Sequence, residues 1–178
     1  AACTPTEQGR VFVLLSSALL EGFEADELTF VIGHELGHHI YQHHDLPIGV
    51  LLSGKVGIRP AQALQLHAWQ RYAEISADRA GLLCCKSFMA AARAFFKLSS
   101  GLHLVPTEER IQAFVEQADE LFRESEQANS AEQTSHGDWL SSHPFSPIRL
   151  RAARAFMKSV AMEEGGMPWS DLELAVHD

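Results

Sequence analysis

Apolar and polar positions divide the chain into a short strand region followed by a series of helices. Residues Arg10–Ser16 read RVFVLLS, a run rich in β-branched and aromatic side chains that follows the turn-like segment Pro5–Gly9. This pattern predicts the second arm of a β-hairpin whose first arm is cut short at Ala1. Residues Ser17–Gly22 then predict a short helix.

The first long helix is predicted to begin at the acidic segment Glu24–Glu27, because carboxylates suit the positive N-terminal end of a helix dipole. Apolar residues recur behind it at helical spacing, through about His44. These residues are Leu28, Val31, Ile32, Leu36 and Ile40. A loop is predicted next, where helix-breaking residues cluster. They are Pro47, Gly49, Gly54, Gly57 and Pro60.

Three more helices are predicted in the rest of the chain. One runs from about Ala61 to Ser99, with a kink or interruption near Gly81, because glycine lowers helix propensity by about 1 kcal/mol. Pro106–Arg123 is an amphipathic helix. The last helix starts at Ser146–Pro147, a serine cap followed by proline at the first helical position, and runs to about Met162.

The order of these elements predicts an α+β fold that is predominantly helical, with a small N-terminal antiparallel sheet or hairpin. A chain of 178 residues with 46% apolar side chains is long enough for one domain with its own core. We therefore expect residues 1–178 to form a single domain with a tail at 163–178. The tail looks like an interrupted helix, so we expect this domain to come from a longer chain.

Charge and cysteine content narrow the function classes. Lys and Arg number 14 and Asp and Glu 23, a net charge of −9 without a long basic block, which argues against nucleic acid or an anionic membrane surface as a partner. The longest apolar runs, Val11–Leu20 and Leu46–Leu52, are shorter than the roughly 18–20 residues of a membrane span. Cys3, Cys84 and Cys85 form no disulfide framework, which fits a reducing, cytosolic compartment.

The first long helix carries the motif His34-Glu35-Leu36-Gly37-His38. Histidines four residues apart lie on one helix face, so both imidazoles can reach a single metal ion. Glu35 is displaced by about 100° around the helix and can reach a metal-activated water without ligating the metal, as a general base requires. The alternative is an exposed polar helix face. The apolar residues on both sides argue against it, because they would bury the histidines.

The second long helix offers a third ligand, which a catalytic zinc site needs in addition to one open position. Glu74 and Asp78 are four residues apart, and antiparallel packing of the two helices would bring Glu74 over the histidine pair. Asp78 could then accept a hydrogen bond from the distal nitrogen of a ligating histidine. The alternative is two surface acids. Small neighbours that permit close helix approach favour the ligand interpretation: Ala73, Ser76, Ala77, Ala80 and Gly81.

A third motif, Ser142-His143-Pro144-Phe-Ser-Pro-Ile-Arg149, precedes and opens the last helix. His143, held by the neighbouring proline, can project into a site, and Arg149 lies in the first turn of the helix. The alternative for His143 is a loop histidine without a function. Arg149 could also belong to a solvated helix face together with Arg151 and Arg154.

Taken together, the three motifs resemble those of the gluzincin metallopeptidases. More narrowly, the chain resembles peptidase family M48, the family of the CAAX prenyl proteases and the HtpX-type membrane quality-control proteases. The resemblance covers about Gln8–Phe156 and includes the strand and the Glu-Ala-Asp-Glu-Leu segment before the first motif. It implies a zincin-like fold with the active-site helix packed on a second, ligand-bearing helix.

The resemblance also implies a role for each matching residue. One Zn²⁺ per chain would be held by His34, His38 and Glu74, and Glu35 would act as general base and acid. Asp78 would support a ligand from behind. His143 would stabilise the oxyanion or bind the substrate backbone, and Arg149 would support the same corner of the site.

The function implied is a zinc-dependent endopeptidase whose polypeptide substrate binds extended, along the Arg10–Ser16 strand. The membrane relatives carry hydrophobic spans before the first motif and after it, whereas Asp45–Pro60 is a short loop here, which implies a soluble domain. The alternative is a non-catalytic or latent zinc-stabilised interaction domain. A non-catalytic site would need a fourth protein ligand, and the candidates lie at the helix end or on other helix faces: His39, His43, His44 and His67.

Overall fold

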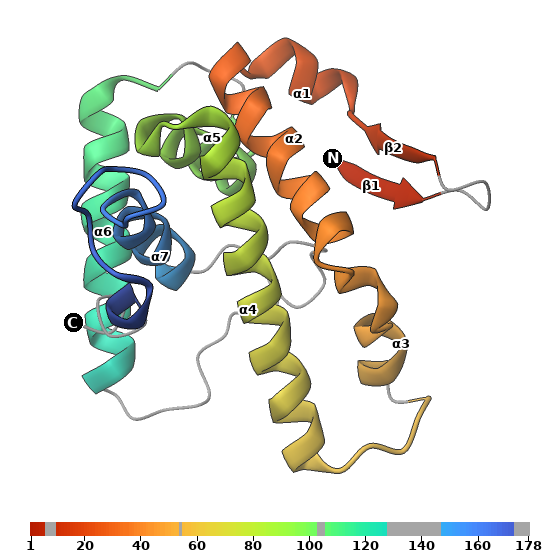
Figure 1. The fold of residues 1–178 in the computed structure, drawn as a ribbon. Coiled ribbons are helices and arrows are strands. Elements are labelled where there is room, and N and C mark those ends of the chain that lie inside the picture. Colours follow the sequence, from red (N-terminus) through yellow and green to blue (C-terminus); the bar gives the residue numbers. More distant parts are fainter. Residues whose placement is uncertain (6–9, 54, 103–105, 128–146, 173–178) are drawn as a thin grey trace.

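The described part of the chain folds into a two-stranded sheet followed by a set of packed helices (Figure 1). The computed structural model describes all residues except 6–9, 54, 103–105, 128–146 and 173–178. Its elements are β1 (Ala2–Pro5), β2 (Val11–Leu14), α1 (Ser17–Gly22), α2 (Ala25–Ile40), the 3₁₀ turn η1 (His43–Asp45), α3 (Ile48–Leu52), α4 (Pro60–Cys85), α5 (Phe88–Ser100), α6 (Glu108–Gln127) and α7 (Pro147–Met157). The α+β, mainly helical prediction is confirmed.

The N-terminal strands form the predicted hairpin. β1 and β2 pair in antiparallel register, with Cys3 opposite Val13 and Ala2 opposite Leu14. Side chains of β2 alternate between half-buried and exposed, as expected for a strand with one face toward the protein. β1 lies against α2, and Cys3 of β1 is buried there. The hairpin therefore borders the helix that carries the first motif.

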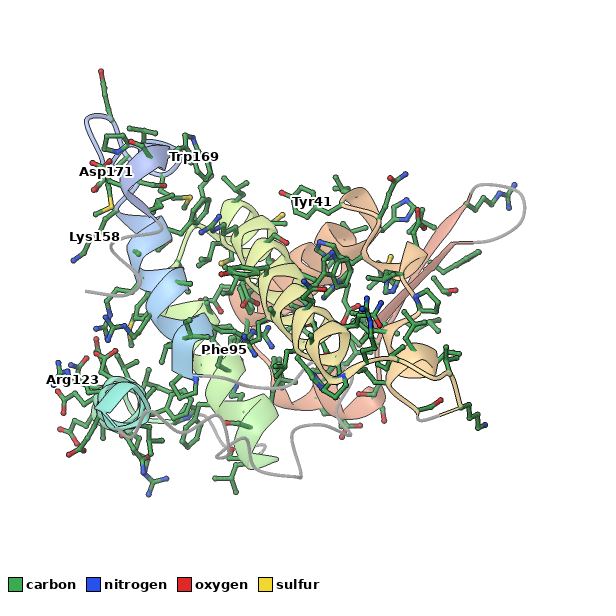
Figure 2. All side chains as sticks on the ribbon, turned by 90° about the horizontal axis from the view of Figure 1, so that it is seen from below. Tyr41, Phe95, Arg123, Lys158, Trp169 and Asp171 are labelled. Atoms are coloured by element: carbon green, nitrogen blue, oxygen red, sulfur yellow. The ribbon has the colours of Figure 1, made fainter. Side chains whose placement is uncertain are left out.

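Helices α2 and α4 run antiparallel, and α5, α6 and α7 pack on the side of α4 that faces away from the hairpin (Figure 1). The core lies among these five helices. Its largest buried apolar side chains include Phe30, Leu82, Phe95, Ile111, Leu150 and Phe156. Figure 2 shows Phe95 inside this helical body, whereas Tyr41, just after α2, lies at its outside. No helix among the described residues has the length and apolar character of a membrane span.

A buried ion network ties the start of α2 to α5. Lys97 Nζ donates hydrogen bonds to Glu27 Oε2 at 2.6 Å and to the carbonyl of Gly22 at 2.7 Å. Arg93 Nε binds the other oxygen of Glu27 at 2.8 Å. Glu27, which the sequence analysis assigned only to the helix dipole, is fully buried and satisfied by two cations. Such pairing is required before a carboxylate can lie in a core.

The close approach of α2 to α4 depends on glycine. A Cβ added at Gly37 would lie 2.8 Å from Ala80 Cβ and 3.0 Å from Ala77 Cα. A Cβ at Gly81 would lie 2.7 Å from the carbonyl oxygen of Phe30. The small residues of α4 therefore let the two helix backbones meet, as expected from the sequence.

We expect Gly37→Ala to lower the free energy of unfolding by about 1–3 kcal/mol, because the added methyl group must push α2 away from α4. Gly49→Ala is the matched control, since a Cβ there meets nothing within 4 Å and alanine favours a helix by about 1 kcal/mol. Urea unfolding of the metal-free proteins measures both. A Gly37→Ala protein as stable as Gly49→Ala would show that the helices are not held this closely.

Two predicted helix ends are wrong. The first helix ends at Ile40 rather than near His44, because Gln42 adopts a left-handed conformation (φ 58°) and the chain turns into η1. The second helix passes straight through Gly81 and stops at Cys85, where Lys86 is left-handed (φ 52°) and Ser87 caps the next helix. Gly81 serves the packing of α4 on α2 rather than a helix break. The two helices end instead at Gln42 and Lys86, residue types that do not predict a positive φ.

Two smaller differences concern the loop and the last helix. The predicted loop after the first motif contains the short helix α3, whose five residues are all at least partly exposed. The last helix ends at Met157, five residues earlier than expected. Its start at Pro147 agrees with the prediction.

Candidate metal centre

Three buried side chains from two helices converge on one point. His34 and His38 come from α2, one turn apart, and Glu74 comes from the middle of α4. The two histidine Nε2 atoms lie 3.1 Å apart. Glu74 Oε2 lies 3.5 Å from Nε2 of His34, and Oε1 lies 3.4 Å from Nε2 of His38. The structure thus brings together the three candidate ligands, with one donor atom from each within 4.8 Å of the others.

The chemistry of this donor set fits a divalent cation. Two imidazole nitrogens and one carboxylate oxygen form a typical protein ligand set of catalytic zinc, which keeps a further position open. All three side chains are buried and shielded from water. A cation between them would therefore give these polar groups the partner that water can no longer provide. Among the described residues, no other three histidine, cysteine or acidic side chains bring their donor atoms within 4.8 Å of one another.

Asp78 holds His34 from behind. Asp78 Oδ1 lies 2.9 Å from Nδ1 of His34, the ring nitrogen that faces away from the convergence point. An imidazole that donates its Nδ1–H to a carboxylate keeps the lone pair of Nε2 available for a metal. The structure therefore places Asp78 where the sequence analysis expected it, one helical turn after Glu74 and behind a candidate ligand.

Arg149 from α7 binds both carboxylates of α4. Its Nε and Nη2 donate to the two oxygens of Asp78 at 2.8 and 2.7 Å, and Nη1 lies 3.0 Å from Glu74 Oε2. Only 5% of Arg149 is exposed, and its guanidinium lies 5.0 Å from the ring centre of Phe95. The alternative of a solvated helix face is therefore wrong for Arg149, whereas Arg154 is partly exposed and pairs with Asp119.

These contacts keep Asp78 and Arg149 charged. Burial by itself would raise the pKa of Asp78, but the charge and hydrogen bonds of Arg149, with a smaller effect of His34, lower that pKa to about 2. Burial would lower the pKa of Arg149, and Asp78 and Glu74 raise it above its usual value instead. Asp78 is thus a carboxylate at neutral pH, as its contact with His34 requires.

His43 also contacts the site, through a contact that the sequence pattern did not predict. Its Nδ1 lies 2.9 Å from Nδ1 of His38, and its Nε2 lies 3.2 Å from Ser76 Oγ on α4. Burial lowers the pKa of His43, against a smaller opposing effect of Glu74, so this imidazole is neutral at pH 7. The helical periodicity placed His43 on a continuing helix, whereas the left-handed Gln42 turns it back over His38.

Glu35 lies between the two histidines in the sequence of α2, and its side chain is buried. Burial raises the pKa of the Cys3 thiol in β1, and the charge of Glu35 adds to this effect. His143, the remaining candidate residue, lies outside the described residues.

Comparison with known proteins agrees with this geometry. The family model described as Peptidase family M48 matches residues 4–157, most of the chain. The chain belongs to Peptidase family M48. The matched region includes the helices α2 and α4 that carry the candidate ligands and the start of α7 with Arg149. Membership in this metallopeptidase family agrees with a His-His-Glu group that could bind a metal.

A curated relative of this M48 chain is the plastoglobule-localized metallopeptidase 48, chloroplastic, of Arabidopsis thaliana. The two sequences are 29% identical over 166 residues, which cover 84% of this chain and 46% of the relative. The chain therefore spans about half the length of this relative. No solved structure matches the M48 chain.

Proposed function

We propose that this chain is a zinc-dependent endopeptidase domain. One Zn²⁺ would be held by His34, His38 and Glu74, and Glu35 would be the general base. The observation that carries the proposal is the convergence of two imidazoles and one carboxylate in a buried site. Membership in Peptidase family M48 supports the same reaction class.

Each residue of the site would have a distinct task during peptide hydrolysis. Bound zinc would supply Lewis acidity, which acidifies a water molecule and polarises the scissile carbonyl. Glu35 would take up the proton of that water and later return it to the leaving amine. Asp78 would keep Nε2 of His34 unprotonated, and Arg149 would hold Asp78 and Glu74 in place. His143 is proposed to stabilise the oxyanion or to bind the substrate backbone.

The substrate is proposed to be a polypeptide in extended conformation. The hairpin borders α2, the helix that carries the proposed base, with β1 packed against this helix. The described sheet has only two strands, so β2 has one edge that no strand of the described chain covers. An extended peptide can add to such an edge through main-chain hydrogen bonds, which align its backbone without strong side-chain preference.

A catalytic site fits the donors better than a purely structural zinc site. A structural site is closed by four protein ligands, whereas the described residues bring three donors together. His43, which could have been a fourth ligand, points its Nδ1 at the back of His38 and its Nε2 at Ser76. With three protein ligands, a fourth position on the metal would remain for water.

Metal analysis combined with peptide cleavage tests the proposal. We expect the protein to bind one equivalent of zinc and to cleave an unstructured protein such as casein. Glu74→Ala should lose about 10-fold or more in zinc affinity, because it removes one of three ligands. Glu120→Ala, which removes an exposed carboxylate from α6, should bind zinc like the wild type. An unchanged zinc stoichiometry and affinity in Glu74→Ala would exclude Glu74 as a ligand.

A further inference from the structure

The two histidines of the candidate metal centre are supported from behind by different groups. His34 turns its Nδ1 to the carboxylate of Asp78, whereas His38 turns its Nδ1 to a second imidazole, that of His43. His43 in turn contacts Ser76 of α4. An imidazole can donate or accept through the same atom, so this arrangement defines the tautomer of His38 only if the direction of each hydrogen bond is known.

The direction follows from the one proton of the Ser76 hydroxyl. Ser76 Oγ donates to the carbonyl of Ala73 at 2.9 Å, so toward His43 it can only accept. His43 therefore carries its proton on Nε2, and its Nδ1 is an acceptor. His38 must then donate from Nδ1, which leaves the lone pair of its Nε2 directed at Glu74 and His34.

The opposite direction would prevent metal binding. If Ser76 donated to His43, then His43 would donate from Nδ1 to His38, and His38 would carry its proton on Nε2, where the metal would have to bind. The Ala73 carbonyl, an acceptor on α4, selects the first direction.

We propose that His43 and Ser76 are positioning residues that hold His38 in its metal-binding tautomer and ring orientation. This inference rests on the proposed function, because it takes His38 as a zinc ligand. The contact between His43 and His38 requires the turn after α2. Gln42 is left-handed at φ 58°, and η1 then carries His43 back over His38, with ring centres 4.9 Å apart. On a continuing helix, five residues after His38, the His43 ring would point to a different side.

Two amide substitutions at His43 separate this role from simple packing. The Oδ1 of asparagine, like Nδ1 of histidine, is bonded to Cγ, so His43→Asn keeps an acceptor for the N–H of His38. The amide of glutamine lies one bond further out, near the former Nε2, so His43→Gln loses that acceptor while remaining closer to histidine in size. Asp45→Asn is the control in the same turn, because Asp45 is exposed.

The measurement is zinc affinity by competition with a chromogenic chelator. We expect His43→Gln to bind zinc about 10–100-fold more weakly than the wild type, the usual effect of removing a group that supports a metal ligand. His43→Asn and Asp45→Asn should stay close to the wild type. Ser76→Ala should weaken binding less than His43→Gln, because water can accept the His43 proton. Melting of the metal-free proteins shows that each variant is folded.

Equal zinc affinities of the asparagine and glutamine variants, whether both weak or both unchanged, would overturn the assignment of His43 while leaving the zinc site standing. A wild-type protein that binds no zinc at all would instead overturn the proposed function, and the inference with it. If His43→Gln does not fold, Ser76→Ala tests the inference instead, because Ser76 is the second proposed positioning residue. A Ser76→Ala protein with wild-type zinc affinity would then overturn the inference.

Discussion

Replacing Glu35 with glutamine should abolish peptide hydrolysis while zinc stays bound. The amide has nearly the same size as the carboxylate but cannot accept the proton of the attacking water, and general-base catalysis typically contributes about 10²–10⁴-fold to the rate. Glu35 is not among the three side chains whose donor atoms converge, so the ligand set of the variant is complete. We therefore expect a loss in kcat of at least this size.

Parallel measurements of zinc content and casein cleavage check this expectation. Glu21→Gln is a suitable control, because it makes the same chemical change at an exposed position at the end of α1. A Glu35→Gln protein that cleaves at the wild-type rate would refute the assignment of Glu35 as base. A variant that has lost its zinc would place Glu35 among the ligands instead.

Arg149→Met should cause the largest loss of stability. The guanidinium makes three contacts of 2.7–3.0 Å with Asp78 and Glu74, and all three side chains are buried. Methionine fills similar space but leaves two carboxylates buried without their cation, a change that typically costs about 3–5 kcal/mol. Because Asp78 and Glu74 also lose their anchor, zinc affinity should fall as well.

Urea unfolding in the presence of a chelator measures this loss without the contribution of bound metal. Arg154→Met is the matched control on the same helix. Its pairing with Asp119 is partly exposed, so its removal should cost less than about 1 kcal/mol. The double variant Arg149→Met/Asp78→Asn should recover part of the stability, since it removes one of the orphaned charges. Equal stabilities of the two single arginine variants would contradict the structural role given to Arg149.

Much of the fold could be predicted from local patterns. A run of β-branched and aromatic residues predicted the hairpin, apolar periodicity predicted α2 and α6, and a serine followed by proline predicted the start of α7. Spacing within a helix likewise paired His34 with His38 and Glu74 with Asp78, because residues four apart lie on one face. These predictions succeeded because each depends on neighbours in sequence.

Other features depended on contacts between distant segments. The left-handed conformations of Gln42 and Lys86 have no signal in residue type, so the ends of α2 and α4 were misplaced. Arg149 could be assigned to a corner of the site or to a solvated face, and only the packing of α7 on α4 joins it to Asp78 and Glu74. His43 was missed because its contact with His38 arises from a turn that periodicity does not describe.

The sequence by itself determined which side chains can carry the chemistry: two imidazoles on one face of a helix, an adjacent carboxylate, and two more carboxylates on another helix face. It could do so because helix geometry converts spacing directly into direction. The sequence also offered Asp78 as a support behind one histidine. Only the tertiary structure decided that this histidine is His34, that Arg149 holds Asp78, and that His43 with Ser76 stands behind His38. Hydrogen bonds between helices depend on distances across the fold, and these are set by packing rather than by spacing along the chain.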